Sequence, residues 1–176
     1  MHKTRRMTLC ALFTALCAVC AQIMIPTQPV AMNLALLAVH LAGALLSPGQ
    51  ALWSMTAYLL MGALGLPVFA GFRGGMGVLL DRTGGYILGY AGCAWLESRL
   101  LEGRKSSIPR MVFSMAAGTL LCYLLGTVWF MLLTATPLWT SLSLCVLPFL
   151  PGDAAKILLA ALLARRLRIP LMKIIN

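Results

Sequence analysis

Long apolar runs, interrupted by proline and glycine rather than by charges, are the feature that most limits how this chain can fold. A helix needs about 20 apolar residues to cross roughly 30 Å of hydrocarbon, and most of these runs are close to that length. Hydrophobic residues make up 61% of the 176 residues, and only 10% are charged. A soluble domain is typically about 25% charged. The sequence therefore excludes a soluble enzyme, a nucleic-acid-binding domain and a disordered chain, and predicts an integral membrane protein.

We expect an all-α protein in which six helices cross the membrane. Pro26 and Pro29 close the first run, and the second run is the shortest. The expected spans are 7–25, 33–46, about 50–66, about 84–101, about 111–136, and from about 145 to the residue before Arg165. The basic N-terminus and first run also resemble a signal peptide, but the run is longer than a usual signal core and lacks a small-residue cleavage site. The spans form one domain, residues 1–176.

The distribution of basic residues independently supports an even number of spans. With six spans, both termini share one side of the membrane with the loops that follow the second and fourth spans. All but three of the 14 Lys and Arg residues fall on that side, the exceptions being Arg73, Arg82 and Lys156. Because cytoplasmic loops carry the Lys and Arg excess, both termini are expected in the cytoplasm. Topology accounts for the net charge of +10 without a nucleic-acid partner.

Cysteine and histidine side chains inside the spans are expected to be structural. Cys17 and Cys20 have the CxxC spacing of redox and zinc sites, but no second pair and no polar setting accompanies them, so a packing role is favoured. His40, midway along the second span, could relay protons or bind a metal. That span holds no Asp, Glu or second His. A hydrogen-bonded packing histidine is therefore the favoured interpretation, and we expect no metal site.

Ten glycines crowd residues 62–92, which join the third span to the fourth and continue into it. Glycine permits positive φ and close backbone approach, so this density indicates a folded loop or lid. A phosphate-binding loop is excluded, because there is no GxxxxGK[ST] motif and no preceding strand. A flexible linker is the alternative. Apolar residues such as Leu66, Phe69 and Phe72 favour instead a loop that packs onto an apolar surface and closes over it.

Asp153 and Lys156 open the last span and lie three residues apart, so they share one face of a helix. A charge at the bilayer centre costs from about 2.5 to well over 10 kcal/mol. Asp153 is one of only four acidic residues. Three roles remain open: an internal salt bridge or helix cap, a ligand site, and a proton path. The ligand site is favoured, because the glycine-rich loop is expected at the same membrane face.

No catalytic or ATP-hydrolysing motif is present. The sequence has no HExxH, no GxSxG and no Walker motif. It also lacks an obvious inverted repeat of broken helices, as found in many secondary transporters. We therefore expect a substrate receptor that depends on a partner for energy and is not an enzyme. A membrane enzyme using Asp153 and Lys156 as acid and base is the weaker alternative.

Small residues on the first span form a candidate docking face. Ala11 and Ala15 have small-xxx-small spacing, and Ala18 extends the stripe by one turn. Small residues let helices approach closely in lipid, where packing drives association. Packing inside the bundle is an equally good interpretation of this pattern.

Three segments, taken together, resemble the BioY family. They are GLPVFAGFRGG at 65–75, DRTGGY at 81–86 and PFLPGDAAK at 148–156. BioY proteins are the biotin-binding S-components of energy-coupling-factor transporters. The resemblance extends over essentially the whole chain and includes its length, six spans and motif order.

The resemblance implies a prokaryotic, multi-pass cell-membrane subunit that captures biotin from outside. It implies as partners a transmembrane coupling protein and two ATP-binding-cassette ATPases, which use the ATP, so that this chain needs no cofactor. The S-component is thought to topple within the membrane to release its substrate. Ala11 and Ala15 match the family's Ala-x-x-x-Ala pattern, which contacts the coupling protein.

The resemblance also implies a set of site residues. Asp153 would accept ureido N–H groups of biotin, and Lys156 would donate to the ureido oxygen or pair with the valerate carboxylate. Arg73 or Arg82 could meet the valerate instead. Phe69, Phe72 and Tyr86 would cover the thiophane ring. The family often has Gly-Pro where this chain has Asp81-Arg82. The expected biotin-binding residues are Gly71, Phe72, Arg73, Arg82, Thr83, Gly84, Gly85, Tyr86, Asp153 and Lys156.

Other functions compete with biotin capture. An S-component for thiamine or riboflavin would have the same architecture, although thiamine's permanent cation would sit poorly beside Lys156 and a basic outer loop. A small membrane enzyme acting on a lipid would need more acidic residues or a metal cluster. A scaffold protein would not need Asp153 and Lys156 on one helix face.

Overall fold

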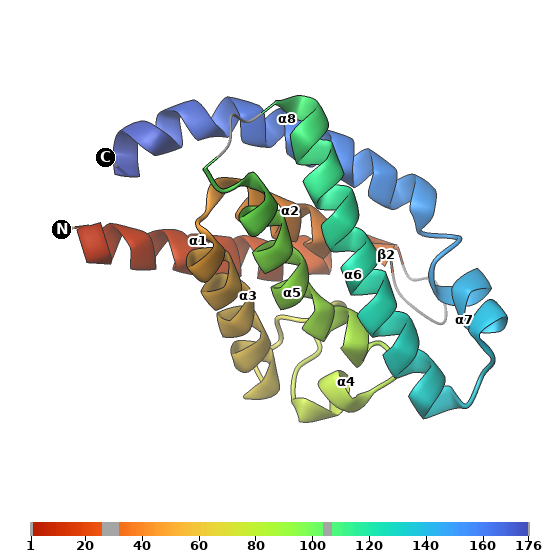
Figure 1. Cartoon of the computed structure of the whole chain (residues 1–176). Helices are drawn as coiled ribbons and strands as arrows, with labels where there is room; N and C mark the ends of the chain where they lie inside the picture. The colour runs from red at the N-terminus through yellow and green to blue at the C-terminus, as the bar shows by residue number, and fades with distance from the viewer. Residues whose placement is uncertain (1, 26–31, 104–106, 176) are drawn as a thin grey trace.

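The computed structural model describes residues 2–25, 32–103 and 107–175 (Figure 1). Pro26 and Pro29, named above as the residues that close the first span, lie outside these ranges. The described residues form eight helices and one pair of antiparallel strands. They are α1 (His2–Gln22), β1 (Met24–Ile25), β2 (Met32–Asn33), α2 (Ala35–Leu45), α3 (Pro48–Ala63), α4 (Met76–Leu80), α5 (Gly84–Leu101), α6 (Ile108–Thr134), α7 (Leu138–Cys145) and α8 (Leu150–Ile175).

Every predicted span contains a helix, so the all-α architecture with six principal helices is confirmed. By length and composition, α1 and α6 could each cross a membrane alone, and the bent pair α7–α8 could form a third crossing. With 11 residues, α2 spans only about 16 Å at 1.5 Å per residue. Nine of those residues are buried. The other helices of the bundle, rather than lipid, surround α2.

A separate short helix, α7, precedes the sixth predicted span, and the sequence did not predict it. The axis bends by 55° between α7 and α8. Pro148 lies in this break and Pro151 in the first turn of α8, where a missing backbone N–H is tolerated. The bend places Asp153 in the first turn of a new helix rather than midway along a continuous one.

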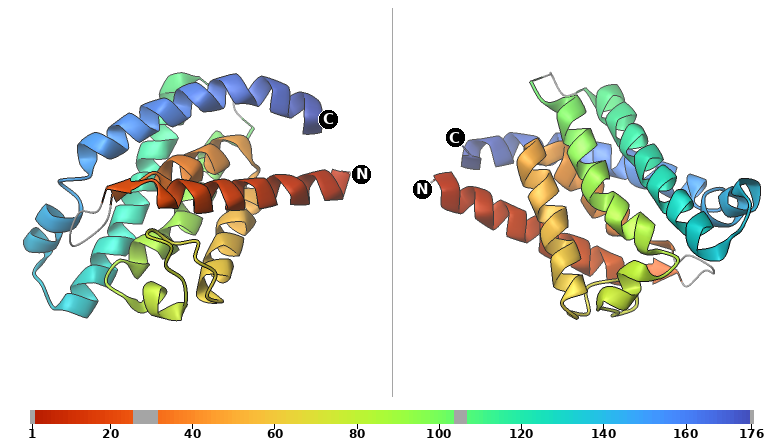
Figure 2. Two further views of the ribbon diagram at one scale, coloured as in Figure 1. Left: turned by 180° about the vertical axis from the view of Figure 1, so that it is seen from behind. Right: turned by 60° about the horizontal axis from the view of Figure 1, so that its bottom comes forward.

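Helix α5 lies at the centre of the bundle and contacts α2, α3 and α6. Helices α1 and α8 run across the direction of α3, α5 and α6, and both termini emerge on the same side of the molecule in every view (Figure 1 and Figure 2). Glycines allow the closest helix contacts: a Cβ at Gly126 would overlap the ring of Tyr86, and one at Gly85 would overlap Trp129.

The glycine-rich segment between α3 and α5 is a folded loop that contains α4, as the sequence predicted. Gln22 at the end of α1 holds it: its Nε2 donates to the carbonyls of Val68 (3.3 Å) and Phe69 (3.2 Å), and its Oε1 accepts from the N–H of Phe72 (2.9 Å). The ring of Phe69 is buried edge-on against Tyr58, with centroids 5.4 Å apart. The loop is therefore fastened to α1 and α3.

Phe69 and Phe72 form a matched pair for testing this loop. Phe69→Ala should destabilise the fold by about 3 kcal/mol, because it empties a buried aromatic position. It should also expose the 64–75 segment to protease. Phe72→Ala should change neither property measurably, because Phe72 is 72% exposed. Thermal unfolding in detergent and limited proteolysis provide the two readouts. Equal effects of the two variants would contradict the loop's anchoring role.

Candidate functional site

Asp153 and Lys156 form a buried ion pair in the first turns of α8. The Lys156 Nζ donates to Asp153 Oδ1 at 2.7 Å. The two residues are only 5% and 8% exposed. The sequence predicted their shared helix face, and the pair satisfies each charge inside a low-dielectric environment, where an unpaired charge is strongly disfavoured.

The second carboxylate oxygen of Asp153 is held from another helix. The hydroxyl of Tyr123 on α6 donates to Asp153 Oδ2. Both oxygens of Asp153 therefore have one partner each, on opposite sides of the carboxylate. This arrangement fixes the plane of the carboxylate and aligns α8 with α6.

A small cavity of about 60 Å³ adjoins this pair. A second one, of about 50 Å³, lies on the side of the glycine-rich loop and shares Asn33, Tyr86 and Tyr90 with the first. A larger hollow of about 380 Å³ lies between the β-strands and α8 and is bounded by Asn33 and Lys156. Small-molecule sites usually occupy about 300–1,000 Å³. A ligand of that size would have to join these spaces by moving side chains between them.

The predicted residues at the start of α5 divide into lining and packing positions. Tyr86 lines both small cavities, and its hydroxyl lies 3.2 Å from that of Thr127. Thr83 lines the loop-side cavity, and its buried hydroxyl has no hydrogen-bond partner within the described residues. Gly84 and Gly85 instead allow close packing, because a Cβ there would overlap Leu79 and Trp129 respectively.

The predicted loop residues are spread over the loop. Arg73 lines the loop-side cavity and lies 3.9 Å from Asp81. Gly71 has a φ of +72° and adjoins Met24. Phe72 and Arg82 are exposed and do not line either small cavity. Of the two arginines proposed to meet a ligand carboxylate, Arg73 is therefore the better placed.

Sequence reasoning did not single out Asn33, Tyr90 or Tyr123 as site residues, although all three line the cavity beside Asp153. A tyrosine inside an apolar span is a usable signal, since a buried hydroxyl needs a partner. The signal does not say which partner, because Asp153 lies 30 residues away on another helix.

The predicted docking face lies on a groove of about 780 Å³ between α1 and α3. Ala11 and Ala15 are exposed and line it together with Trp53 and Ala57. Ala18 is half-buried and packs against the core. The groove is mostly apolar in composition.

Comparison with known proteins identifies the family of this chain. The profile of the BioY family matches residues 1–172. The chain belongs to the BioY family. The "Probable biotin transporter BioY" of Pyrococcus horikoshii is 36% identical over 166 residues, covering 94% of this chain and 98% of that protein. The "Biotin transporter BioY" of Thermotoga maritima is also 36% identical, over 164 residues, covering 93% of this chain and 96% of that protein.

A solved structure shares the fold. The crystal structure of "the S-component for biotin from an ECF-type ABC transporter" superposes with a TM-score of 0.87 at 29% identity. The match covers 94% of this chain and 92% of that one. The BioY chain is thus an all-α membrane protein with the S-component architecture.

Asp81 and Arg82 replace the family's frequent Gly-Pro without loosening the turn before α5. The Arg82 N–H donates to Asp81 Oδ1 at 2.7 Å, and the Asp81 carbonyl accepts from Trp129 Nε1 at 3.0 Å and from the Gly84 N–H at 2.9 Å. Hydrogen bonds to Asp81 here perform the stiffening that proline's fixed φ would supply.

Proposed function

We propose that this chain is the biotin-capturing S-component of an energy-coupling-factor transporter. The observation that carries the proposal is the buried Asp153–Lys156 pair, held by Tyr123 beside the cavities under the folded loop. Membership of the BioY family and relatives named as biotin transporters support biotin as the substrate.

The pair retains the hydrogen-bonding capacity that biotin requires. A carboxylate offers about four lone-pair positions, and Lys156 and Tyr123 occupy one on each oxygen of Asp153. The remaining positions can accept the two ureido N–H groups. Lys156 has three N–H donors, of which one is used by Asp153. The others are available for the ureido oxygen or the valerate carboxylate, as charge-assisted hydrogen bonds in a dry pocket.

Asp153→Asn should weaken biotin binding more than tenfold, since the amide loses charge-assisted bonds worth about 1.5–3 kcal/mol each. Membrane insertion should be unchanged. The matched control is Glu102→Gln, because Glu102 is an exposed carboxylate that pairs with Arg99 and lines neither small cavity. The measurement is the binding of labelled biotin to the two purified variants. If Asp153→Asn binds like the unsubstituted protein, Asp153 does not contact the ligand.

A second candidate is an S-component for another vitamin, such as thiamine or riboflavin. The six-helix architecture is equally compatible with an S-component for one of these vitamins. Thiamine carries a permanent cation, which the ammonium of Lys156 and the arginine beside the loop-side cavity would repel. Biotin offers an anionic tail to the same groups, so electrostatics favours biotin.

The proposed partners are a transmembrane coupling protein and two ATP-binding-cassette ATPases. In this proposal the ATPases hydrolyse ATP, and this chain is not an enzyme. The groove between α1 and α3 is the proposed contact with the coupling protein. Ala11 and Ala15 are exposed along it, so a partner helix could approach the α1 backbone closely.

Ala11→Trp or Ala15→Trp should abolish co-purification with the coupling protein, because an indole would fill the groove. Biotin binding should persist, since neither alanine lines the cavities beside Asp153. Leu12→Trp is the matched control: Leu12 is exposed on the same helix but does not line the groove. Normal co-purification of the Ala11 and Ala15 variants would place the docking surface elsewhere.

We further propose that both termini face the cytoplasm and the glycine-rich loop faces outward, as the Lys and Arg distribution indicates. Single cysteines at the exposed positions Thr4 and Met76 test this orientation. Native cysteines give little background, because five are buried and Cys10 is half-buried. A membrane-impermeant maleimide should label Met76→Cys in intact cells, and Thr4→Cys only after permeabilisation. The reverse pattern would invert the topology.

A further inference from the structure

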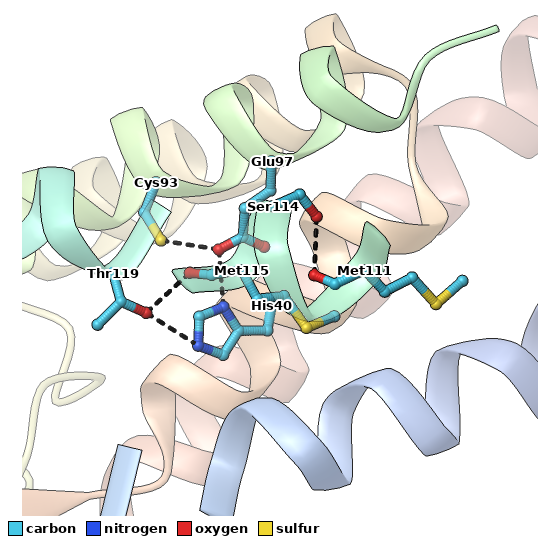
Figure 3. Close-up of polar contacts among 7 residues, drawn as sticks. All are labelled: His40, Cys93, Glu97, Met111, Ser114, Met115 and Thr119. Atoms are coloured by element: carbon cyan, nitrogen blue, oxygen red, sulfur yellow. Dashed lines mark hydrogen bonds and ion pairs between the residues drawn. The ribbon is translucent and has the colours of Figure 1, made fainter. Parts of the chain in front are cut away.

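A second polar cluster lies inside the bundle, apart from the site just described. His40 of α2 and Glu97 of α5 are fully buried, with His40 Nδ1 2.7 Å from Glu97 Oε1 (Figure 3). The thiol of Cys93, one helical turn before Glu97, donates to the same oxygen at 3.1 Å. An imidazole nitrogen, a sulfur and a carboxylate thus converge, with their ligand atoms within 4.8 Å of one another.

Thr119 on α6 adds a longer contact to the same cluster. Its hydroxyl donates to the carbonyl of Met115 at 2.9 Å and lies 3.5 Å from His40 Nε2 (Figure 3). The His40–Glu97 pair is electrically neutral when the two side chains share one proton, which suits the interior of a membrane protein.

Hydrogen bonding leaves Glu97 incompletely satisfied. Its Oε2 is buried and has no hydrogen-bond partner within the described residues. Space for the carboxylate is created by glycines on both neighbouring helices: a Cβ at Gly43 would lie 2.5 Å from Oε2, and one at Gly118 would overlap Oε1. A buried carboxylate oxygen without a donor is costly, and one way to satisfy it is a cation.

The cluster lies next to a cavity at one end of the molecule. This cavity, of about 270 Å³ at the α2–α3 turn, has Gly43 and Ser98 among its lining residues. Gly43 packs against Glu97 Oε2, and Ser98 follows Glu97 in α5. The cavity and the unpartnered oxygen therefore share Gly43 as a neighbour.

We propose that His40, Cys93 and Glu97 form a binding site for one borderline divalent metal ion of the zinc(II) type. Nitrogen, thiolate and carboxylate ligands together suit this class of ion. The ligands are His40 Nδ1, Cys93 Sγ and Glu97 Oε1, with a water molecule as the fourth, which can donate to Oε2. Binding releases the proton that His40 and Glu97 share and the thiol proton. A neutral imidazole, a carboxylate and a thiolate then surround the 2+ ion, so the net charge stays zero.

Coordination demands only a small rearrangement. With metal–ligand bonds of about 2.0–2.3 Å, tetrahedral ligand atoms stand about 3.4 Å apart. The nitrogen–oxygen and sulfur–oxygen distances are 2.7 and 3.1 Å, so each has to widen by less than about 1 Å. Bound metal would tie α2 directly to α5 and replace two hydrogen bonds by coordinate bonds.

The test measures zinc bound to the full chain in nanodiscs, purified without a polyhistidine tag, stripped with chelator, reloaded with zinc and desalted. We expect one zinc per chain. Loading with cobalt(II) should give the thiolate-to-cobalt charge-transfer band and the visible bands of a tetrahedral site. Cys93→Ser and Glu97→Gln should each lower zinc affinity more than tenfold. Cys17→Ser, at a buried cysteine outside the cluster and outside the cavities beside Asp153, and His2→Gln should retain it.

Biotin binding by each variant reports on folding independently of metal. A folded, unsubstituted chain that retains no zinc after desalting would overturn the proposal and leave a hydrogen-bonded His40–Glu97 clamp between α2 and α5. Zinc that is retained equally by Cys93→Ser, or cobalt spectra without the thiolate band, would overturn it too. Zinc lost in His2→Gln but kept in the cluster variants would place the ion at the N-terminus instead.

Discussion

The ion pair between Asp153 and Lys156 sets the strongest constraint on this molecule. Neither charge is tolerated alone within a bilayer, and each partner restricts the other to one face of α8. Tyr123 completes the arrangement by holding the second carboxylate oxygen from α6. The pair thereby aligns two helices, adjoins the cavities beneath the loop and presents the residual hydrogen-bonding capacity that a polar ligand head requires. In the proposed function, stability and ligand recognition depend on the same atoms.

Close helix packing makes this polar interior possible. Glycines at the α5–α6 contact receive the ring of Tyr86 and the carboxylate of Glu97, so large or charged side chains enter the bundle without separating its helices. The folded loop is also held by one side chain, since Gln22 at the end of α1 forms hydrogen bonds with the backbone of the loop. On the outer surface of α1 and α3, small residues remain uncovered along a groove.

Much of this architecture could be predicted from the sequence. Apolar runs and their prolines located the helices, and the basic residues selected an even number of crossings. Spacing alone placed Asp153 and Lys156 on one face. What the sequence could not give was the pairing between helices: nothing near His40 in the chain indicates Glu97, which is 57 residues away, or Tyr123 as the partner of Asp153. The break between α7 and α8 was not predicted either, because Pro148, which lies in it, was assigned to the last span.

Binding of labelled biotin to the purified chain, in nanodiscs and without any partner subunit, tests the central claim most directly. Biotin methyl ester and thiamine serve as competitors. The account predicts tight, saturable binding of one biotin per chain, weaker competition by the ester if the cationic groups read the tail carboxylate, and no competition by thiamine. A correctly folded sample that binds no biotin would contradict the account.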